Sequence, residues 1–176
     1  MLIKERHEVI IEKHPHYESL NKKLMEDIRK FEFFPPERLE NYTNIQGTQY
    51  NPTEKEWTPT MGLILDWVYR LVNDQVSKGA HEFYGEKKCN MWFAKYNKGD
   101  YCKEHWHYPW ALMGFVYFVK CPKGSSPLVF PTSGKKVKAE EGKVVIFAGN
   151  IFHSVPPNKC EDRIVMAGNL GYDLNT

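Results

Sequence analysis

The second half of the chain is a series of short apolar segments separated by turn residues, and this pattern constrains the fold most strongly. The segments begin after Gly85 and follow one another closely up to Leu170. In order, they are CNMWFAKY, YCKEHWHY, ALMGFVYFVK, PLVFP, KKVKAEE, KVVIFA, IFHSV and DRIVMAGNL. Many short strands at regular spacing are typical of a β-sandwich or barrel. We therefore expect a mainly β core over residues 86–176.

The first half has a different pattern, with one strand and two helices. Residues 7–13 are expected to form the opening strand. Apolar residues at helical spacing predict a first helix over Tyr17–Phe33 and a second from about Thr60 to Lys78. The polar, turn-rich residues 37–60 between them are expected to form a surface or lid-like loop.

Length and composition favour a single folded unit. The 176 residues are enough for one sizeable core and too few for two comfortable ones. Apolar residues make up 41% and charged residues 26%, which is ordinary globular composition. We predict one domain over residues 1–176, in which the strand, helices and loop of residues 1–85 support the β core.

Charge, hydropathy and cysteine usage argue against several classes of partner and location for this chain. A net charge of +2 is too small to indicate nucleic acid or an anionic membrane. No apolar run approaches the roughly 20 residues of a membrane span, and charges within the N-terminal apolar stretch argue against a secretory signal. Four scattered cysteines without a C-x-x-C pair indicate free thiols in a reducing compartment, so we expect a cytoplasmic protein.

Three histidines and one arginine occupy strand-like surroundings in the β half. His105 and His107 are two positions apart, and on an extended strand such residues point to the same face, so both imidazoles can reach one metal ion. His153 follows the apolar run VVIF and a short turn, and Arg163 lies ten residues further on. This combination predicts a metal centre with an anion-binding arginine beside it.

The chemistry of such a centre depends on its open coordination positions. An Fe(II) oxygenase commonly uses two histidines and a carboxylate, with open positions opposite. If 2-oxoglutarate is the cosubstrate, its distal carboxylate needs a buried cation, and arginine offers a bidentate fork that stays charged. In a barrel whose last strands run side by side, His153 and Arg163 are expected on adjacent strands, both pointing inward.

Further segments near these residues form a recognisable set. The sequence YNKGD at residues 96–100 precedes His105, GKVVIF at residues 142–147 precedes His153, and Val116–Tyr117 belongs to the strand run between them. The chain resembles the Fe(II)/2-oxoglutarate-dependent dioxygenases, a double-stranded β-helix group that includes the prolyl hydroxylases. It is most similar to a small single-domain subgroup of phages and marine bacteria.

The resemblance covers residues 88–172 well and the N-terminal half only through its strand-helix-loop-helix order. It implies a mainly β fold with N-terminal helices and a double-stranded β-helix (jelly-roll, cupin-like) core. It also implies roles for individual residues. These are His105 and His153 as iron ligands, Arg163 as the anchor of the distal carboxylate, and Tyr117 and Tyr96 as hydrogen-bond partners of bound 2-oxoglutarate.

One position departs from the family pattern, which is His-x-Asp or His-x-Glu. Here the carboxylate position holds His107, and a neutral imidazole there leaves the metal centre one unit more positive. Imidazole still binds iron, as well as zinc, copper and nickel. The chain is similar in this respect to His-x-His members of the phage-like subgroup, which implies His105, His107 and His153 as the metal ligands. The alternative is that His107 turns away and leaves an open position.

The activity implied by the resemblance is hydroxylation of an unactivated C–H bond in a peptide side chain or small molecule. The resemblance implies Fe(II) as the cofactor and 2-oxoglutarate and O₂ as cosubstrates, with succinate and CO₂ as released products. Tyr108 and Trp110, just beyond the histidines, are candidates for a substrate wall, and residues 37–60 for a lid.

Three other functions stay open at this point. A cupin-type three-histidine dioxygenase would not use 2-oxoglutarate, although the cupin glutamate is missing, since Ala111 and Leu112 occupy its expected position. A zinc hydrolase also uses three histidines and an open site, but no general base is evident. The third alternative is a non-catalytic β-sandwich that binds a metal or a sugar, or that has a structural role.

Overall fold

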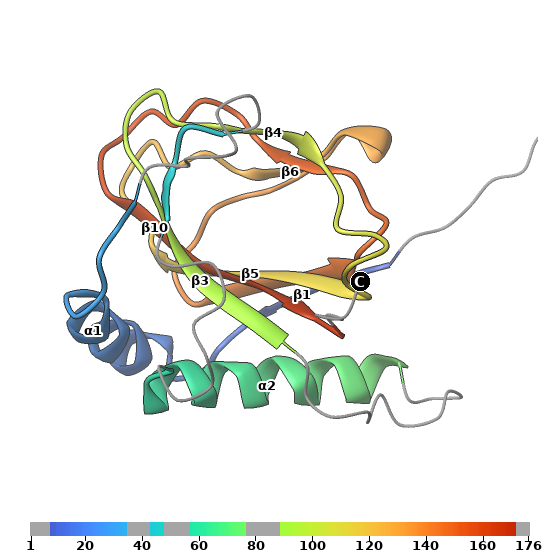
Figure 1. Cartoon of the computed structure of the whole chain (residues 1–176), viewed down its shortest axis with the longest axis horizontal. Helices are drawn as coiled ribbons and strands as arrows, with labels where there is room; N and C mark the ends of the chain where they lie inside the picture. Colours follow the sequence, from blue (N-terminus) through green and yellow to red (C-terminus); the bar gives the residue numbers. More distant parts are fainter. Residues whose placement is uncertain (1–7, 35–42, 48–56, 77–88, 172–176) are drawn as a thin grey trace, which may run out of the picture.

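The computed structural model describes residues 8–34, 43–47, 57–76 and 89–171. Two antiparallel sheets face each other, and two helices cover the outer side of the larger sheet (Figure 1). The helices are α1 (Tyr17–Ile28) and α2 (Pro59–Val76). Neither helix is long and apolar enough to cross a membrane, and the same holds for every helix among the described residues.

The larger sheet has six strands in the order β1-β8-β5-β10-β3-β2, and each neighbouring pair is antiparallel. Its long central strand β10 pairs with β5 on one side and β3 on the other. In chain order, the six strands are β1 (Val9–Lys13), β2 (Gln46–Gly47), β3 (Cys89–Tyr96), β5 (Met113–Lys120), β8 (Lys143–Ala148) and β10 (Arg163–Leu170).

The smaller sheet has four strands in the order β4-β9-β6-β7. They are β4 (Cys102–His105), β6 (Leu128–Phe130), β7 (Lys135–Val137) and β9 (His153–Val155), and a short 3₁₀ turn, Pro131–Ser133, connects β6 to β7. All eight strands expected in the second half are therefore present, as β3 to β10. The facing antiparallel sheets confirm the predicted mainly β class with N-terminal helices.

Alternation along the strands divides the core into two layers. Phe115, Tyr117 and Val119 of β5 pack with α1 and α2 on the outer side of the larger sheet. Val116 and Phe118, the residues between them, belong to the layer between the two sheets. This is the expected period of two, by which successive side chains point to opposite faces. A side chain of the larger sheet can therefore take part in a site between the sheets only if it points into the inter-sheet layer.

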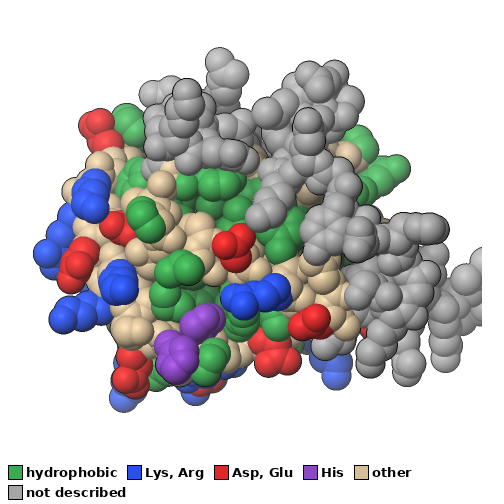
Figure 2. Space-filling view, turned by 90° about the horizontal axis from the view of Figure 1, so that it is seen from below, with side chains coloured by type: hydrophobic (Ala, Val, Ile, Leu, Met, Phe, Trp, Pro, Cys, Tyr) green, Lys and Arg blue, Asp and Glu red, His purple; other side chains and the backbone are tan. Residues whose placement is uncertain are grey.

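Both helices contribute one buried stripe to the outer layer. In α1 this stripe holds Leu20, Leu24 and Ile28, as the helical spacing predicted. In α2 the most deeply buried residues include Ile64, Val68 and Val72, whereas Leu63 is exposed. Figure 2 shows this helical side of the molecule, where hydrophobic side chains lie among charged ones.

Several element boundaries differ from the prediction. The first helix ends at Ile28 instead of Phe33, and the strand expected over YCKEHWHY ends at His105. Within the expected loop, Gln46 and Gly47 pair with β3, so part of it is an edge strand. Residues 37–42 and 48–56 of the proposed lid lie outside the described residues.

The YNKGD segment is a tight turn after β3. The backbone N–H of Asn97 donates to Oδ2 of Asp100 over 2.7 Å. Gly99 has a φ of +90°, a left-handed backbone conformation that glycine adopts more readily than other residues. The turn directs the chain from the larger sheet into β4 of the smaller sheet. It thereby places His105 on the sheet opposite Arg163.

Candidate functional site

The three predicted histidines lie together at one place between the sheets. One ring nitrogen of each lies within 4.8 Å of the others. His105 and His153 are direct cross-strand partners on β4 and β9, and their ring centroids are 4.2 Å apart. The ring of His107 lies 4.8 Å from that of His153 and 5.3 Å from that of His105. His107 therefore joins the cluster and does not turn away from it.

The reason expected for the position of His107 is wrong, because His107 is not on a strand. β4 ends at His105, and the backbone N–H groups of His107 and Tyr108 both donate to the carbonyl of Gly149, over 2.7 and 3.0 Å. Gly149 belongs to the β8–β9 turn and packs closely against the carbonyl of Ala111. A non-local backbone contact, and not strand alternation, brings the imidazole to the cluster.

Hydrogen bonds fix the orientation of two of the rings. Nδ1 of His105 lies 2.9 Å from the carbonyl of Lys103, and Nδ1 of His153 lies 3.0 Å from that of Ile151. Because a carbonyl only accepts, each Nδ1 carries the proton and Nε2 keeps its lone pair. Such a partner on the far nitrogen is typical of metal-binding histidines.

The cluster is electrically neutral at pH 7. Burial lowers the pKa of His105, lowers that of His153 well below its usual value, and lowers that of His107 to about 4. The neighbouring imidazoles further oppose protonation of His107 and His153. Three unprotonated imidazoles are a donor set that suits iron, zinc, copper or nickel. The residues therefore fit a divalent transition metal.

Arg163 is the most deeply buried charged residue of the described chain, with 1% of its surface exposed. Its Nε and Nη1 atoms are buried without a hydrogen-bond partner, and it forms no ion pair with any residue that the structure describes. Its guanidinium carbon lies 4.3 Å from the ring centroid of Tyr96 and 5.5 Å from that of Phe118. A buried cation with free N–H groups is costly unless an anion completes it.

The expectation that His153 and Arg163 lie on adjacent strands is wrong. His153 begins β9 in the smaller sheet, whereas Arg163 begins β10 in the larger one. The connection between the strands, residues 156–162, crosses from one sheet to the other. Both side chains still lie beside the inter-sheet layer. The ring of His153 contacts that of Phe147, and the guanidinium of Arg163 lies near the ring of Phe118; both phenylalanines belong to that layer.

The role expected for Tyr117 is also wrong, because its side chain points to the helices. Its hydroxyl donates to Oδ1 of Asn21 on α1 over 2.7 Å, and its ring meets that of Trp67 on α2 edge to face. The larger sheet therefore separates Tyr117 from the histidines. The resemblance matched the sequence pair Val116–Tyr117, but strand alternation places Val116 and not Tyr117 on the inter-sheet side.

Tyr96, unlike Tyr117, points into the layer between the two sheets. It is the cross-strand partner of Arg163, is buried, and belongs to the inter-sheet layer. Burial raises the pKa of its hydroxyl, so it is neutral and can donate a hydrogen bond at pH 7. Its contact with a cosubstrate stays a prediction.

Asn90 and Asn169 were not among the candidate residues, although both are buried polar residues in the larger sheet. They are cross-strand partners, and the backbone N–H of Asn169 donates to Oδ1 of Asn90 over 3.2 Å. The available signal was a polar amide within the apolar strand RIVMAGNL. Buried amides need partners, so each points to a specific contact.

Exposed aromatic side chains follow the histidines in the β4–β5 connection. Trp106, Tyr108 and Trp110 are all exposed, and the ring of Trp106 packs edge to face on Phe152 at 4.5 Å. Since His105 and His107 alternate with them in sequence, these rings belong to the same segment as the cluster. The substrate-wall role of Tyr108 and Trp110 stays a prediction.

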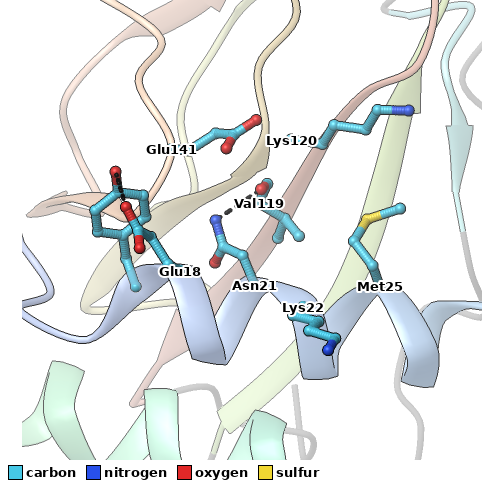
Figure 3. A pocket seen from close by; sticks show the side chains of 8 residues that line it. Glu18, Asn21, Lys22, Met25, Val119, Lys120 and Glu141 are labelled. Carbon is cyan, nitrogen blue, oxygen red and sulfur yellow. Dashed lines mark hydrogen bonds between the residues drawn. The ribbon is translucent and has the colours of Figure 1, made fainter.

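A shallow pocket elsewhere contains none of the predicted site residues. It lies where α1 meets the end of β5, and Figure 3 shows Glu18, Lys22, Lys120 and Glu141 around it. Within it, Nδ2 of Asn21 donates to the carbonyl of Val119 over 2.7 Å. Its mixed charges and outer location separate it from the histidine cluster.

No family model and no curated protein matches the sequence. Solved structures do match the fold. A prolyl-4-hydroxylase of Pseudomonas putida has a TM-score of 0.71 at 17% identity, over 95% of this chain and 94% of that one. A viral collagen prolyl hydroxylase of Paramecium bursaria Chlorella virus 1, in a 2-oxoglutarate complex, has a TM-score of 0.68 at 16% identity, over 91% and 94%.

A third similar structure is an oxidoreductase of the 2-oxoglutarate–Fe(II) oxygenase family from Burkholderia pseudomallei. Its TM-score is 0.65 at 13% identity, over 92% of this chain and 84% of that one. At these identities the likeness is one of fold. It confirms the predicted double-stranded β-helix core, now with nearly full-length coverage that includes the N-terminal helices.

Proposed function

We propose that this chain is an Fe(II)- and 2-oxoglutarate-dependent oxygenase that hydroxylates an unactivated C–H bond in a peptide side chain or small molecule. The observation that carries the proposal is the combination of three converging neutral imidazoles with a buried, unpaired guanidinium in the space between the sheets. The fold shared with prolyl hydroxylases and a 2-oxoglutarate–Fe(II) oxygenase supports it.

In this proposal, His105, His107 and His153 hold the iron. When bound, Fe(II) supplies O₂ activation coupled to the oxidative decarboxylation of 2-oxoglutarate to succinate and CO₂. The protein's part at this position is to offer three unprotonated nitrogens without competing charge. The Nδ1 hydrogen bonds of His105 and His153 hold their rings in place before any metal arrives.

Arg163 binds the distal carboxylate of 2-oxoglutarate in this proposal. Its free Nε and Nη1 atoms can donate charge-assisted hydrogen bonds, and the Nη1 edge of the guanidinium can receive a carboxylate. The ring of Tyr96 supports the guanidinium from one side, and the surrounding apolar layer keeps water away from the ion pair. A dicarboxylate thus explains why the fold buries an unpaired cation here.

In this proposal, the substrate binds against the exposed aromatic segment Trp106–Trp110. Exposed indole and phenol rings suit an apolar or peptide surface, which they can contact while keeping their polar atoms hydrated. Four free cysteines agree with the proposed cytoplasmic location. A three-histidine dioxygenase that does not use 2-oxoglutarate gives Arg163 no task, and the proposal therefore prefers the 2-oxoglutarate enzyme.

Turnover of 2-oxoglutarate tests the proposal. Purified protein is incubated with Fe(II), ascorbate, O₂ and 2-oxoglutarate, and succinate is measured with and without candidate peptides. We expect succinate that requires both Fe(II) and 2-oxoglutarate and that His153→Ala abolishes. Metal-dependent oxidation of a substrate without any need for 2-oxoglutarate would favour the cupin-type alternative. Metal bound by wild type and retained at full stoichiometry in His153→Ala would refute the ligand set.

A further inference from the structure

His107 differs from the other two cluster histidines in the partner of its second nitrogen. Nδ1 of His105 and of His153 each bond to a backbone carbonyl, whereas Nδ1 of His107 is buried and makes no hydrogen bond within the described chain. A neutral imidazole carries a proton on one of its two nitrogens. If Nε2 is to bind a metal, the buried Nδ1–H of His107 needs an acceptor.

A buried acceptor without a donor lies beside it. Asn169 is 4% exposed, and its Oδ1 is buried without a hydrogen-bond partner. Asn169 on β10 is the direct cross-strand partner of Gly114 on β5. A Cβ atom built on Gly114 would lie 3.0 Å from Nδ1 of His107, so the imidazole lies over Gly114 and next to Asn169. Side chains of direct cross-strand partners are neighbours on one face of a sheet.

The absence of a side chain at position 114 provides the room. The same Cβ atom would lie 2.9 Å from Cε2 of Phe147, whose strand pairs with β5 on the other side of Gly114. Asn169 in turn is tied to β3, where Asn90 accepts its backbone N–H.

We infer that Asn169 is a positioning residue for His107, which accepts a hydrogen bond from Nδ1–H at its Oδ1 and thereby keeps Nε2 directed into the histidine cluster. The consequence for metal binding rests on the proposed function, whereas the hydrogen bond itself does not. Asn169 acts through its side chain, unlike the backbone carbonyls that bond Nδ1 of His105 and of His153. A single substitution can therefore remove it.

The tautomer of His107 in the metal-free chain tests the hydrogen bond directly. Nitrogen-15 NMR of the histidine rings at pH 7.5 should place the His107 proton on Nδ1 in wild type. Asn169→Leu, which has similar volume and no acceptor, should shift the population toward Nε2–H, and Asn169→Asp should restore Nδ1–H. A wild-type His107 that carries its proton on Nε2 would overturn the inference, even if Asn169→Leu fails to fold.

The second measurement is the affinity for Co(II), determined by competition with a chelator. Loss of an outer partner of a metal ligand typically costs about 10–100-fold in affinity, and we expect a loss in this range for Asn169→Leu. Asn169→Asp should keep wild-type affinity, because a carboxylate also accepts from Nδ1–H. A merely structural role would lower the affinity in neither variant once the protein is folded.

The matched control is Asn21→Leu, another buried asparagine, 6% exposed and on the helical side of the larger sheet. It should lower thermal stability and leave the Co(II) affinity unchanged. Equal affinity of wild type and folded Asn169→Leu, or equal losses in Asn169→Leu and Asn21→Leu, would refute the inference while leaving the metal site intact. A wild type that binds no divalent metal would instead refute the proposed function. The tautomer of His107 would still show whether Asn169 accepts its hydrogen bond.

Discussion

At the scale of single residues, the account depends on a few buried polar groups that lack partners. Arg163 has two nitrogen atoms without a hydrogen-bond partner, and Nδ1 of His107 and Oδ1 of Asn169 likewise have none. Nearly all buried polar atoms of folded proteins have partners, so such exceptions mark places where a ligand or a neighbouring group completes the structure. Further unpaired atoms, Oδ2 of Asp27 and Nε1 of Trp57, lie on the helical side, whereas those of Arg163, His107 and Asn169 border the histidine cluster or the inter-sheet layer beside it.

Replacing Arg163 by alanine should weaken 2-oxoglutarate binding and leave metal binding largely intact. Truncating one partner of a buried charge pair costs about 2–5 kcal/mol, and each 1.4 kcal/mol corresponds to about tenfold in Kd. Isothermal titration of the Zn(II)-loaded protein with 2-oxoglutarate measures this loss. Arg163→Lys keeps the charge without the fork and should fall between wild type and alanine. Unchanged affinity in Arg163→Ala would remove Arg163 from the site.

The histidine cluster should make the metal-free protein less stable in mild acid. Burial holds the pKa of His107 at about 4 in the folded chain, whereas an unfolded histidine titrates near 6.5. Between these values the unfolded chain binds more protons, so stability falls as pH decreases from 7 toward 4. Urea unfolding at pH 7.5 and 5.0 measures the effect. His107→Leu should show a smaller decrease than wild type; an identical decrease would contradict the assigned burial.

At the scale of elements, local pattern predicted the strands well and their placement less well. The eight segments from CNMWFAKY to RIVMAGNL all form strands, because alternation and turn residues are local signals. The pairing of β9 with β4, and of β10 with β3 and β5, is set by contacts distant in sequence. The sequence therefore predicted that His153 and Arg163 matter, but placed them on adjacent strands.

The same limit explains the errors at Tyr117 and His107. The face to which Tyr117 points depends on the register of β5 in the larger sheet, and a shift by one residue reverses it. The position of His107 depends on the carbonyl of Gly149, more than forty residues away in sequence. A motif match supplies residue types in order, and neither of these geometric facts is contained in that order.

Tyr117→Phe should destabilise the fold without affecting the cosubstrate. Loss of its hydroxyl leaves Oδ1 of the buried Asn21 without this donor, which typically costs about 1–3 kcal/mol. Chemical denaturation measures the loss, and titration with 2-oxoglutarate should give the wild-type Kd. A large rise in that Kd, with the fold intact, would place Tyr117 at the cosubstrate after all.

Gly114→Ala should lower metal affinity, because the added Cβ meets His107 and Phe147 at 3.0 and 2.9 Å. The matched control is Gly62→Ala in α2, where an added Cβ has nothing within 4 Å. Alanine is the better helix former by up to about 1 kcal/mol, so the control should be at least as stable as wild type. Chelator competition compares the two. Equal metal affinity in both variants would contradict the close approach of His107 to β5.

At the scale of the whole molecule, the candidate site is shared between the two sheets. β4 and β9 of the smaller sheet carry His105 and His153, while β10 of the larger sheet carries Arg163 and Asn169. The helices pack on the outer side of the larger sheet, the side away from the histidine cluster (Figure 1). A metal and a dicarboxylate bound between the sheets would link the two layers.

The most direct measurement is an anaerobic titration of the Fe(II)-loaded protein with 2-oxoglutarate, followed by visible absorption. Chelation of Fe(II) by the keto acid gives a charge-transfer band, and we expect it to saturate at one equivalent in wild type. The band should be shifted to much higher 2-oxoglutarate concentrations in Arg163→Ala and be absent in His153→Ala. A wild-type protein that binds Fe(II) yet develops no band at any 2-oxoglutarate concentration would contradict the account.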